Sequence, residues 1–149
     1  MSTKNTQQAG ALRLSYTIFC DDVRLEVGNK LSLMGVFREV VVQHFPVTVM
    51  KFAVVSQWQG EGRHLSEVRI TTEDRQQMVV LSDPAPFEVM RGGVANNVSF
   101  FFNVTFQRPG VYRVQTLIDS TLADEQELTL IQVDANGAPV PDDSSEAVN

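Results

Sequence analysis

The sequence is poor in the residues from which most enzymes and metal centres are built. It has one cysteine and two histidines, which excludes an internal disulfide framework and a zinc site made of several thiolates. No stretch approaches the roughly 20 consecutive apolar residues that a membrane span needs, so no membrane association is expected. Lys and Arg total 12 against 18 Asp and Glu, and they form no basic stripe, so nucleic acid is not an expected partner.

The composition also divides the chain of 149 residues into three parts. Residues 134–149 hold four acids and no Lys or Arg, together with glycine and prolines, which predicts a disordered acidic tail. Residues 1–11 are polar and lack the apolar segment of a secretory signal. They are therefore expected to be a flexible N-terminus, and the lone cysteine fits a cytoplasmic location. A single domain over residues 12–133 is expected between them.

What the sequence has in abundance is the alternation typical of strands, with almost no helical periodicity. The clearest run is Val98, Phe100, Phe102, Val104 and Phe106, which share one face of a strand and are predicted to point into a core. Similar short runs recur along the chain, separated by segments rich in glycine, proline, asparagine and aspartate. This spacing predicts an all-β fold, an antiparallel immunoglobulin-like β-sandwich of eight or nine strands.

A proline–glycine corner near the end of the domain narrows the type of sandwich. Pro109 and Gly110 are followed by Tyr112, which alternates inward with Val114. In immunoglobulin-like folds a buried tyrosine just after such a corner returns its hydroxyl to nearby backbone. The alternative is a plain core tyrosine, which leaves the fold class unchanged.

Two groups of carboxylates are candidate calcium ligands. Asp21 and Asp22 lie near the start of the domain, and Asp119 and Asp124 lie in the last predicted hairpin. Carboxylate oxygens from sandwich loops are typical ligands of hard cations. The two groups lie at the same end of the sandwich only if residues 77–90 form one bent strand. If the Asp-Pro-Ala-Pro segment divides this region into two strands, the two groups lie at opposite ends. The alternative function of these acids is to cap turn amides and pair with neighbouring basic residues.

The residues that could act as catalysts are scattered. His44 and His64 share no short motif with each other, with Cys20 or with a serine. Cys20 falls on the predicted inward face of its strand and no helix N-terminus is available to activate it, so it is interpreted as a core residue. An enzyme would need a cleft that brings His44, His64 and Asp119 within about 3 Å of one another or of a shared substrate. No catalytic or cofactor-binding residue is therefore predicted, and no cofactor.

Two features favour binding to another protein instead. Phe101 interrupts the polar face of its strand, so its ring is expected to face solvent or to be covered by something. Residues 39–43, which contain Val41, form a β-branched run with apolar side chains on both faces, as in an edge strand that accepts another chain. We therefore expect a non-catalytic binding or interaction module of unknown specificity, self-associating as a homodimer through a sheet edge or face. The alternative is a calcium- or ligand-binding sandwich.

One segment resembles a known family. From Phe19-Cys20-Asp21-Asp22 to Gly35-Val36-Phe37 the sequence is similar to the opening signature of a bacterial family known only as a domain of unknown function. The likeness extends through the Pro-Gly-x-Tyr corner and covers most of residues 14–133. The resemblance implies a β-sandwich of bacterial origin, and it implies no activity, cofactor or partner.

Overall fold

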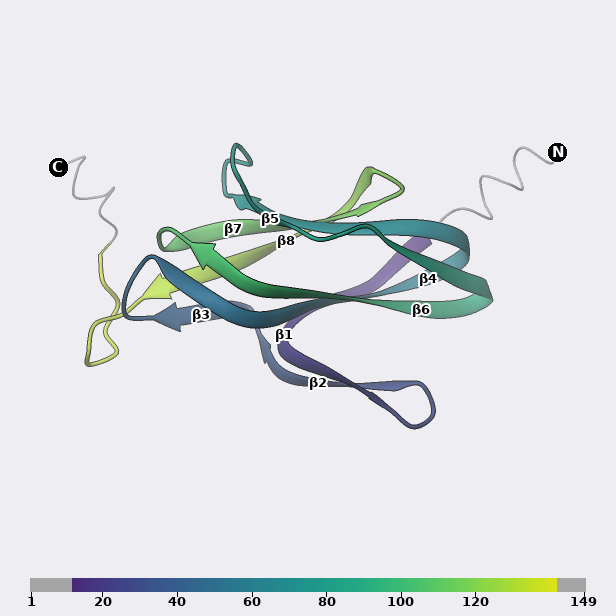
Figure 1. Cartoon of the computed structure of the whole chain (residues 1–149), viewed down its shortest axis with the longest axis horizontal. Helices are drawn as coiled ribbons and strands as arrows, with labels where there is room; N and C mark the ends of the chain where they lie inside the picture. The colour runs from purple at the N-terminus through teal and green to yellow at the C-terminus, as the bar shows by residue number, and fades with distance from the viewer. Residues whose placement is uncertain (1–11, 142–149) are drawn as a thin grey trace.

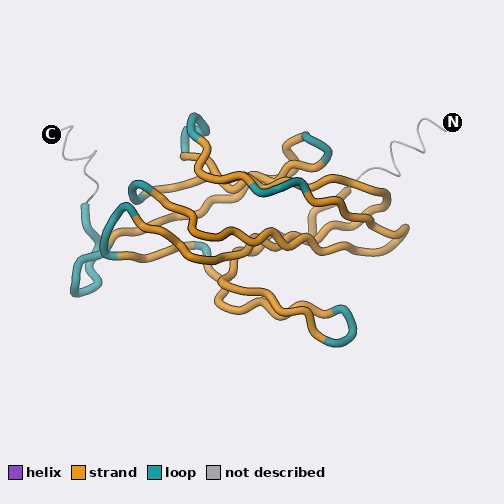
Figure 2. Tube along the Cα trace, viewed as in Figure 1, coloured by secondary structure: helices purple, strands orange, loops and turns teal. Residues whose placement is uncertain are grey.

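The computed structural model describes residues 12–141, and this part of the chain contains strands and no helix (Figures 1 and 2). It therefore has no helix that could span a membrane. The predicted flexible N-terminus, residues 1–11, and residues 142–149 of the predicted tail lie outside the described residues. The eight strands are β1 (Leu12–Glu26), β2 (Lys30–Phe37), β3 (Glu39–Val42), β4 (Val47–Thr72), β5 (Met78–Leu81), β6 (Ala85–Phe106), β7 (Gly110–Ile118) and β8 (Thr121–Gln132).

All eight strands belong to one mixed sheet. Its order is β2-β1-β4-β7-β8-β3, and β5 and β6 also pair with β4. The all-β class and the number of strands are confirmed. The prediction of a purely antiparallel arrangement is wrong for one pair, because β3 runs parallel to β8. Residues 39–42 pair with residues ninety positions further along the chain, and a hydrophobic pattern contains no information on the direction of such a distant partner.

The sheet doubles over where the two longest strands, β4 and β6, bend together. Their register shifts between Gly60 and Gly62, which have φ angles of 140° and 107°. On β6 the facing Gly92 has a φ of 77°. Glycine adopts these angles without the penalty that a Cβ would bring, so the paired strands can turn as a unit. The first half of β4 pairs with β1, and its second half pairs with β7.

The main core lies between the two parts of the doubled sheet. Phe19 of β1, Phe52 and Ile70 from the two halves of β4, and Tyr112 of β7 all belong to it and are at most 4% exposed. A smaller cluster around Cys20 lies on the other face of the first half of β4. The β1–β2 hairpin extends away from the doubled part of the sheet (Figure 1), and its Leu31 and Leu33 pack against the smaller cluster. Burial of apolar surface on both faces of β4 is the main stabilising contribution to this architecture.

The predicted inward face of β6 is correct at one end and wrong at the other. Val104 and Phe106 are buried, but Phe100 and Phe102 are 38% and 61% exposed, and Phe101 is the core residue, at 3%. The strand changes face at Asn103, whose φ is 55°. Alternation holds only while the backbone stays regular, and a left-handed residue interrupts it.

Residues 77–90, for which one bent strand or two separate strands were the alternatives, are divided between two strands. β5 ends at Leu81 and β6 begins at Ala85, and both run antiparallel along the same edge of β4. The β7–β8 turn lies against Leu65, near the point where β1 begins opposite Gly60. The β1–β2 turn lies beyond Glu26, at the other end of β1. The first and last hairpin turns are therefore at opposite ends of β1.

The first residues of the predicted tail form a turn. Val133 makes a bridge with Pro139, and the amide of Val140 donates to the carbonyl of Gln132. The Asp134 carboxylate accepts the amides of Asn136 and Ala138 at 2.8 and 2.9 Å. An aspartate that satisfies backbone donors in this way stabilises a turn without apolar burial, so hydrogen-bonded structure continues past residue 133.

Candidate functional site

The four predicted metal ligands lie in separate places. Asp22 pairs with Lys51 at 2.9 Å, and this contact is the main reason that the pKa of its carboxyl is lowered. The Asp21 side chain lies over Gly35 on β2. Asp124 accepts a hydrogen bond from the Thr17 hydroxyl at 3.0 Å. Within residues 12–141, no three acidic, histidine or cysteine side chains are grouped so that they could hold a metal ion.

Asp119, the fourth of these acids, pairs with a histidine. Its Oδ2 lies 2.8 Å from Nδ1 of His64, and its Oδ1 accepts the amide of Leu65 at 2.9 Å. The hydrogen bond from His64 is the largest of the effects that lower the pKa of Asp119. An active site made of His44, His64 and Asp119 would need these side chains close together. His64 and Asp119 are in contact, whereas His44 is exposed in the loop between β3 and β4.

The surroundings of His64 do not fit a general base. Its Nε2 lies 3.1 Å from the carbonyl oxygen of Glu61, and its ring packs against that of Phe87 with centroids 5.6 Å apart. The residue is 8% exposed. Both ring nitrogens thus face protein acceptors, so neither is directed at a substrate.

The thiol of Cys20 is also enclosed. It is 0% exposed in the smaller apolar cluster, and burial is the main reason that the pKa of the thiol is raised. A thiol that is kept protonated is a poor nucleophile and a poor metal ligand. The interpretation of Cys20 as a core residue agrees with this position.

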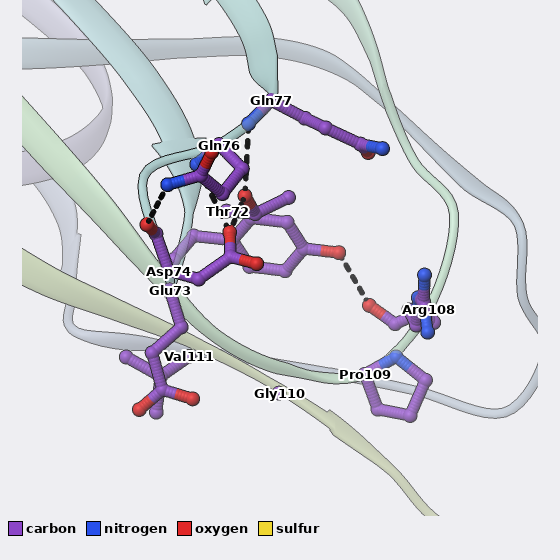
Figure 3. Close-up of a pocket in the computed structure, with 10 residues that line it drawn as sticks. Thr72, Glu73, Asp74, Gln76, Gln77, Arg108, Pro109, Gly110 and Val111 are labelled. Atoms are coloured by element: carbon purple, nitrogen blue, oxygen red, sulfur yellow. Dashed lines mark hydrogen bonds between the residues drawn. The ribbon is translucent and has the colours of Figure 1, made fainter.

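A polar hollow with a volume of about 350 Å³ lies between the β4–β5 turn and the β6–β7 corner (Figure 3). Tyr112 is one of its lining residues, and the Tyr112 hydroxyl donates to the carbonyl of Arg108 at 2.6 Å. At its rim the Asp74 carboxylate accepts the Thr72 hydroxyl at 2.6 Å and the Gln76 amide at 3.0 Å. These polar groups form hydrogen bonds within the two turns, so we interpret them as groups that stabilise the turns. The inward tyrosine predicted from the sequence is present.

The two predicted interface residues have different environments. Val41 is 56% exposed on β3, the last strand in the sheet order, which agrees with the expected edge strand. Phe101 is covered by the core and stacks on Phe52 with ring centroids 5.2 Å apart. Of the two alternatives for its ring, exposed or covered, the second holds. The exposed aromatic rings on this strand are those of Phe100 and Phe102.

Those two rings form a surface beside a long open edge. Phe100 and Phe102 stack with centroids 6.3 Å apart, and the Lys51 ammonium lies 5.1 Å from the centre of the Phe100 ring. Among the described residues, β6 pairs with β4 along residues 85–106, and no strand pairs with its other side over residues 93–106. We call the open side of residues 93–106 the β6 edge.

Sequence reasoning missed the β6 edge, although a signal for it is present. Residues 92–107 contain no Asp, Glu, Lys, Arg, His or Pro. Edge strands are normally protected by charged side chains, proline or shortness, so an uncharged run of this length is informative once the strand is known to be an edge. The sequence alone could not show which strand occupied the edge, and the alternation directed attention to Phe101 instead.

Solved structures share the fold at very low identity. The alkylpurine DNA glycosylase AlkC of Pseudomonas fluorescens, bound to DNA containing an abasic site analogue, matches 82% of this chain with 7% identity and a TM-score of 0.52. A β-glucosidase of Erythrobacter marinus, EmGH1, matches 81% with 9% identity and a TM-score of 0.50. The chain spans 30% and 15% of the lengths of these two proteins. At such identities the likeness concerns the fold alone.

No curated protein matches the chain. A family model does match it over residues 15–131, most of the chain and nearly all of the strands described above. The matched region includes the Cys-Asp-Asp segment and the tyrosine corner. The chain belongs to DUF6941, a family of unknown function.

Proposed function

We propose that this protein is a non-catalytic interaction module that self-associates by pairing the β6 edges of two copies. The observation that carries the proposal is the combination of length, openness and lack of charge in one strand. β6 is 22 residues long, and residues 92–107 have no charged side chain and no proline. An exposed strand with these properties is a template for another strand, because the N–H and C=O groups on its open side have no strand partner within residues 12–141.

The other edges of the sheet are better protected against pairing. β3 and β5 have four residues each, and β3 begins with Glu39. β2 begins with Lys30 and is interrupted by Gly35, whose φ is 69°. Short strands, charged residues and local distortions are the usual devices that prevent edge-to-edge pairing. Among the described strands, only β6 combines an open edge with a long run free of charged side chains, so the interface is proposed there and not at Val41.

A second copy of this chain is the partner that fits best. An antiparallel pair about a twofold axis places the same strand opposite itself, and an uncharged strand meets no like charge in that arrangement. The chain as a whole carries a net charge of −6, so other surfaces of two copies repel each other more than this one does. The exposed rings of Phe100 and Phe102 beside the edge add apolar area that pairing would bury.

The proposal includes an immunoglobulin-like build for the doubled sheet and a cytoplasmic setting. The hydrogen bond from Tyr112 to the carbonyl of Arg108, four residues earlier, supports the first, because it has the form of the tyrosine corner of immunoglobulin-like folds. The single, buried Cys20 supports the second, because the chain requires no disulfide.

Sedimentation velocity over a range of protein concentrations tests the interface. The wild-type protein is expected to sediment as a dimer, and Phe102→Asp is expected to sediment as a monomer with an unchanged far-UV circular dichroism spectrum. Val94→Lys, a second exposed position on the β6 edge, is expected to act in the same way. Val41→Lys is the matched control: Val41 is exposed to a similar degree on β3, so this variant should remain a dimer.

Two results would overturn the proposal. One is a wild-type protein that remains monomeric at about 100 μM, a concentration far above the dissociation constants of most specific homodimers. The other is a dimer that Val41→Lys disrupts and the two β6 variants leave intact, since this would locate the interface at β3.

A further inference from the structure

The β6 edge contains one regular stretch with clear bounds. Residues 94–102 pair with β4 in a single register. Gly92, with a φ of 77°, lies before this stretch at the bend, and Asn103, with a φ of 55°, follows it directly. A residue with left-handed backbone interrupts regular pairing. A second strand can therefore pair without interruption along residues 94–102 and no further.

Twofold symmetry restricts how this stretch can pair with its own copy. In an antiparallel pair of identical strands, the axis passes between one residue and the same residue of the partner. All of residues 94–102 is paired only if this residue is Val98, at the middle of the stretch. We propose that Val98 lies opposite the partner's Val98, an inference that rests on the β6 dimer proposed above and specifies its register.

This register covers the exposed apolar side chains of both copies. Val98 packs against the smaller cluster on the outer face, and Val94, Phe100 and Phe102 share that face because side chains alternate along a strand. In one chain these three residues are 55%, 38% and 61% exposed. Val94 would lie opposite the partner's Phe102, and Asn96 opposite the partner's Phe100. Directly opposite residues have Cβ atoms about 4.5–5.5 Å apart, so each ring gains a side-chain neighbour in the partner.

The neighbouring registers lose part of this arrangement. If the axis moves one residue toward the N-terminus, Phe102 lies opposite the partner's Gly92, which has no side chain to cover the ring. If the axis moves one residue toward the C-terminus, Asn103 enters the paired stretch, where its left-handed backbone interrupts the ladder. An axis at Val98 avoids both losses, because the irregular residues of each copy then lie outside the paired stretch.

The inner face of the same stretch provides a second argument. Nδ2 of Asn97 is buried and has no hydrogen-bond partner among the described residues. In the proposed register Asn97 lies opposite the partner's Ser99, whose hydroxyl can accept a hydrogen bond from an amide. A buried donor without an acceptor is destabilising. The dimer would therefore supply an acceptor that the single chain lacks, and the twofold axis would make this contact twice.

Disulfide formation between cysteine variants tests the register. Val98→Cys is expected to form a disulfide-linked dimer by itself, because directly opposite residues have Cα atoms at a distance that a disulfide can span. Val94→Cys and Phe102→Cys are expected to link to each other when mixed and to stay unlinked when separate. The native Cys20 is 0% exposed, so its thiol does not compete. Val41→Cys, exposed to a similar degree on β3, is the matched control and should stay unlinked.

Isotope-filtered nuclear magnetic resonance tests the same register without any substitution. In an equal mixture of labelled and unlabelled wild-type protein, contacts between copies are expected from the Val94 methyl groups to the Phe102 ring. This measurement remains decisive if a cysteine at either position weakens the dimer. A dimer without these contacts would overturn the register.

The outcomes separate the register from the dimer itself. A dimer that links through Asn96→Cys or Phe100→Cys, and not through Val98→Cys, would overturn the register while supporting the β6 interface. A dimer that links through Val41→Cys would overturn both. A wild-type protein that remains monomeric at about 100 μM would overturn the interface, and the register with it.

Discussion

Phe101 and Phe102 are neighbours on β6 with opposite environments, so their truncation tests the face change at Asn103 directly. Phe101 is 3% exposed and stacks on Phe52 at 5.2 Å, whereas Phe102 is 61% exposed. Truncation of a buried phenylalanine costs about 3–5 kcal/mol of unfolding free energy, and about 1 kcal/mol of this belongs to an aromatic pair. For a residue as exposed as Phe102 the loss should be within about 0.5 kcal/mol.

Urea unfolding, followed by circular dichroism, converts these energies into midpoints. With a slope of about 2 kcal/mol per M of urea for a domain of this size, Phe101→Ala should lower the midpoint by about 2 M. Phe102→Ala should lower it by less than about 0.3 M. The titrations are run at several protein concentrations and compared in the monomeric limit, because the proposed dimer adds a concentration-dependent stabilisation that Phe102→Ala would also change.

The refuting result is a larger loss for Phe102→Ala than for Phe101→Ala in that limit. It would place Phe102 in the core, as simple alternation with Val104 predicts, and β6 would then have no face change at Asn103. Equal losses would also contradict the structure, because no regular strand buries two consecutive side chains against one core.

Three further predictions follow from local geometry and charge. Gly35→Ala should cost more unfolding free energy than Gly92→Ala. Both glycines have positive φ angles, but only the new Cβ at Gly35 would collide with the Asp21 carboxylate; thermal unfolding of the two variants measures the difference. Tyr112→Phe should destabilise the protein by about 1 kcal/mol by removing the corner hydrogen bond, which urea titration detects. A hydrogen bond from Arg75 is the main reason that the pKa of the Glu125 carboxyl is lowered from 4.5 to about 2. Its stabilising contribution is therefore complete above pH 4.5 and is lost as the pH falls toward 2. Melting temperatures of Glu125→Gln should vary less than those of wild type over this range.

The fold class and the tyrosine corner could be predicted because both depend on residues close together in the chain. Short alternating runs separated by turn residues indicate strands wherever they occur. Pro109 and Gly110 form a corner, and Tyr112 lies two residues beyond Gly110, so its inward direction follows from the alternation of the same strand. These inferences require no knowledge of which strand lies next to which.

What could not be predicted depends on contacts between distant residues. The parallel pairing of β3 with β8 is one example, and the separate locations of Asp22 and Asp119 are another. The β6 edge is a third, because an uncharged strand is equally typical of a central position, where both neighbours are present. Only the observed sheet order shows that, among the described strands, β4 alone pairs with residues 93–106 of β6.

The first half of β4 shows why the surface beside the β6 edge differs from an ordinary solvent-facing sheet. Phe52 and Val54 point into the main core, while Ala53 and Val55 belong to the second cluster with Cys20. A strand that is buried on both faces is expected to be a continuous apolar run, as these four residues are. The sheet is therefore covered on its outer face as well, by side chains of its own strands.

The β6 edge borders this second cluster, which bears on the proposed dimer. Val98 of β6 packs against the cluster, and Phe100 lies two residues further along the same strand. A strand added beside β6 would extend the cluster by one more row of side chains, in the same way that β1 extends it on the other side of β4. The partner would thus bury apolar surface and satisfy backbone groups at the same time, and a strand that offers both gains is a stronger interface than the four-residue edge at β3.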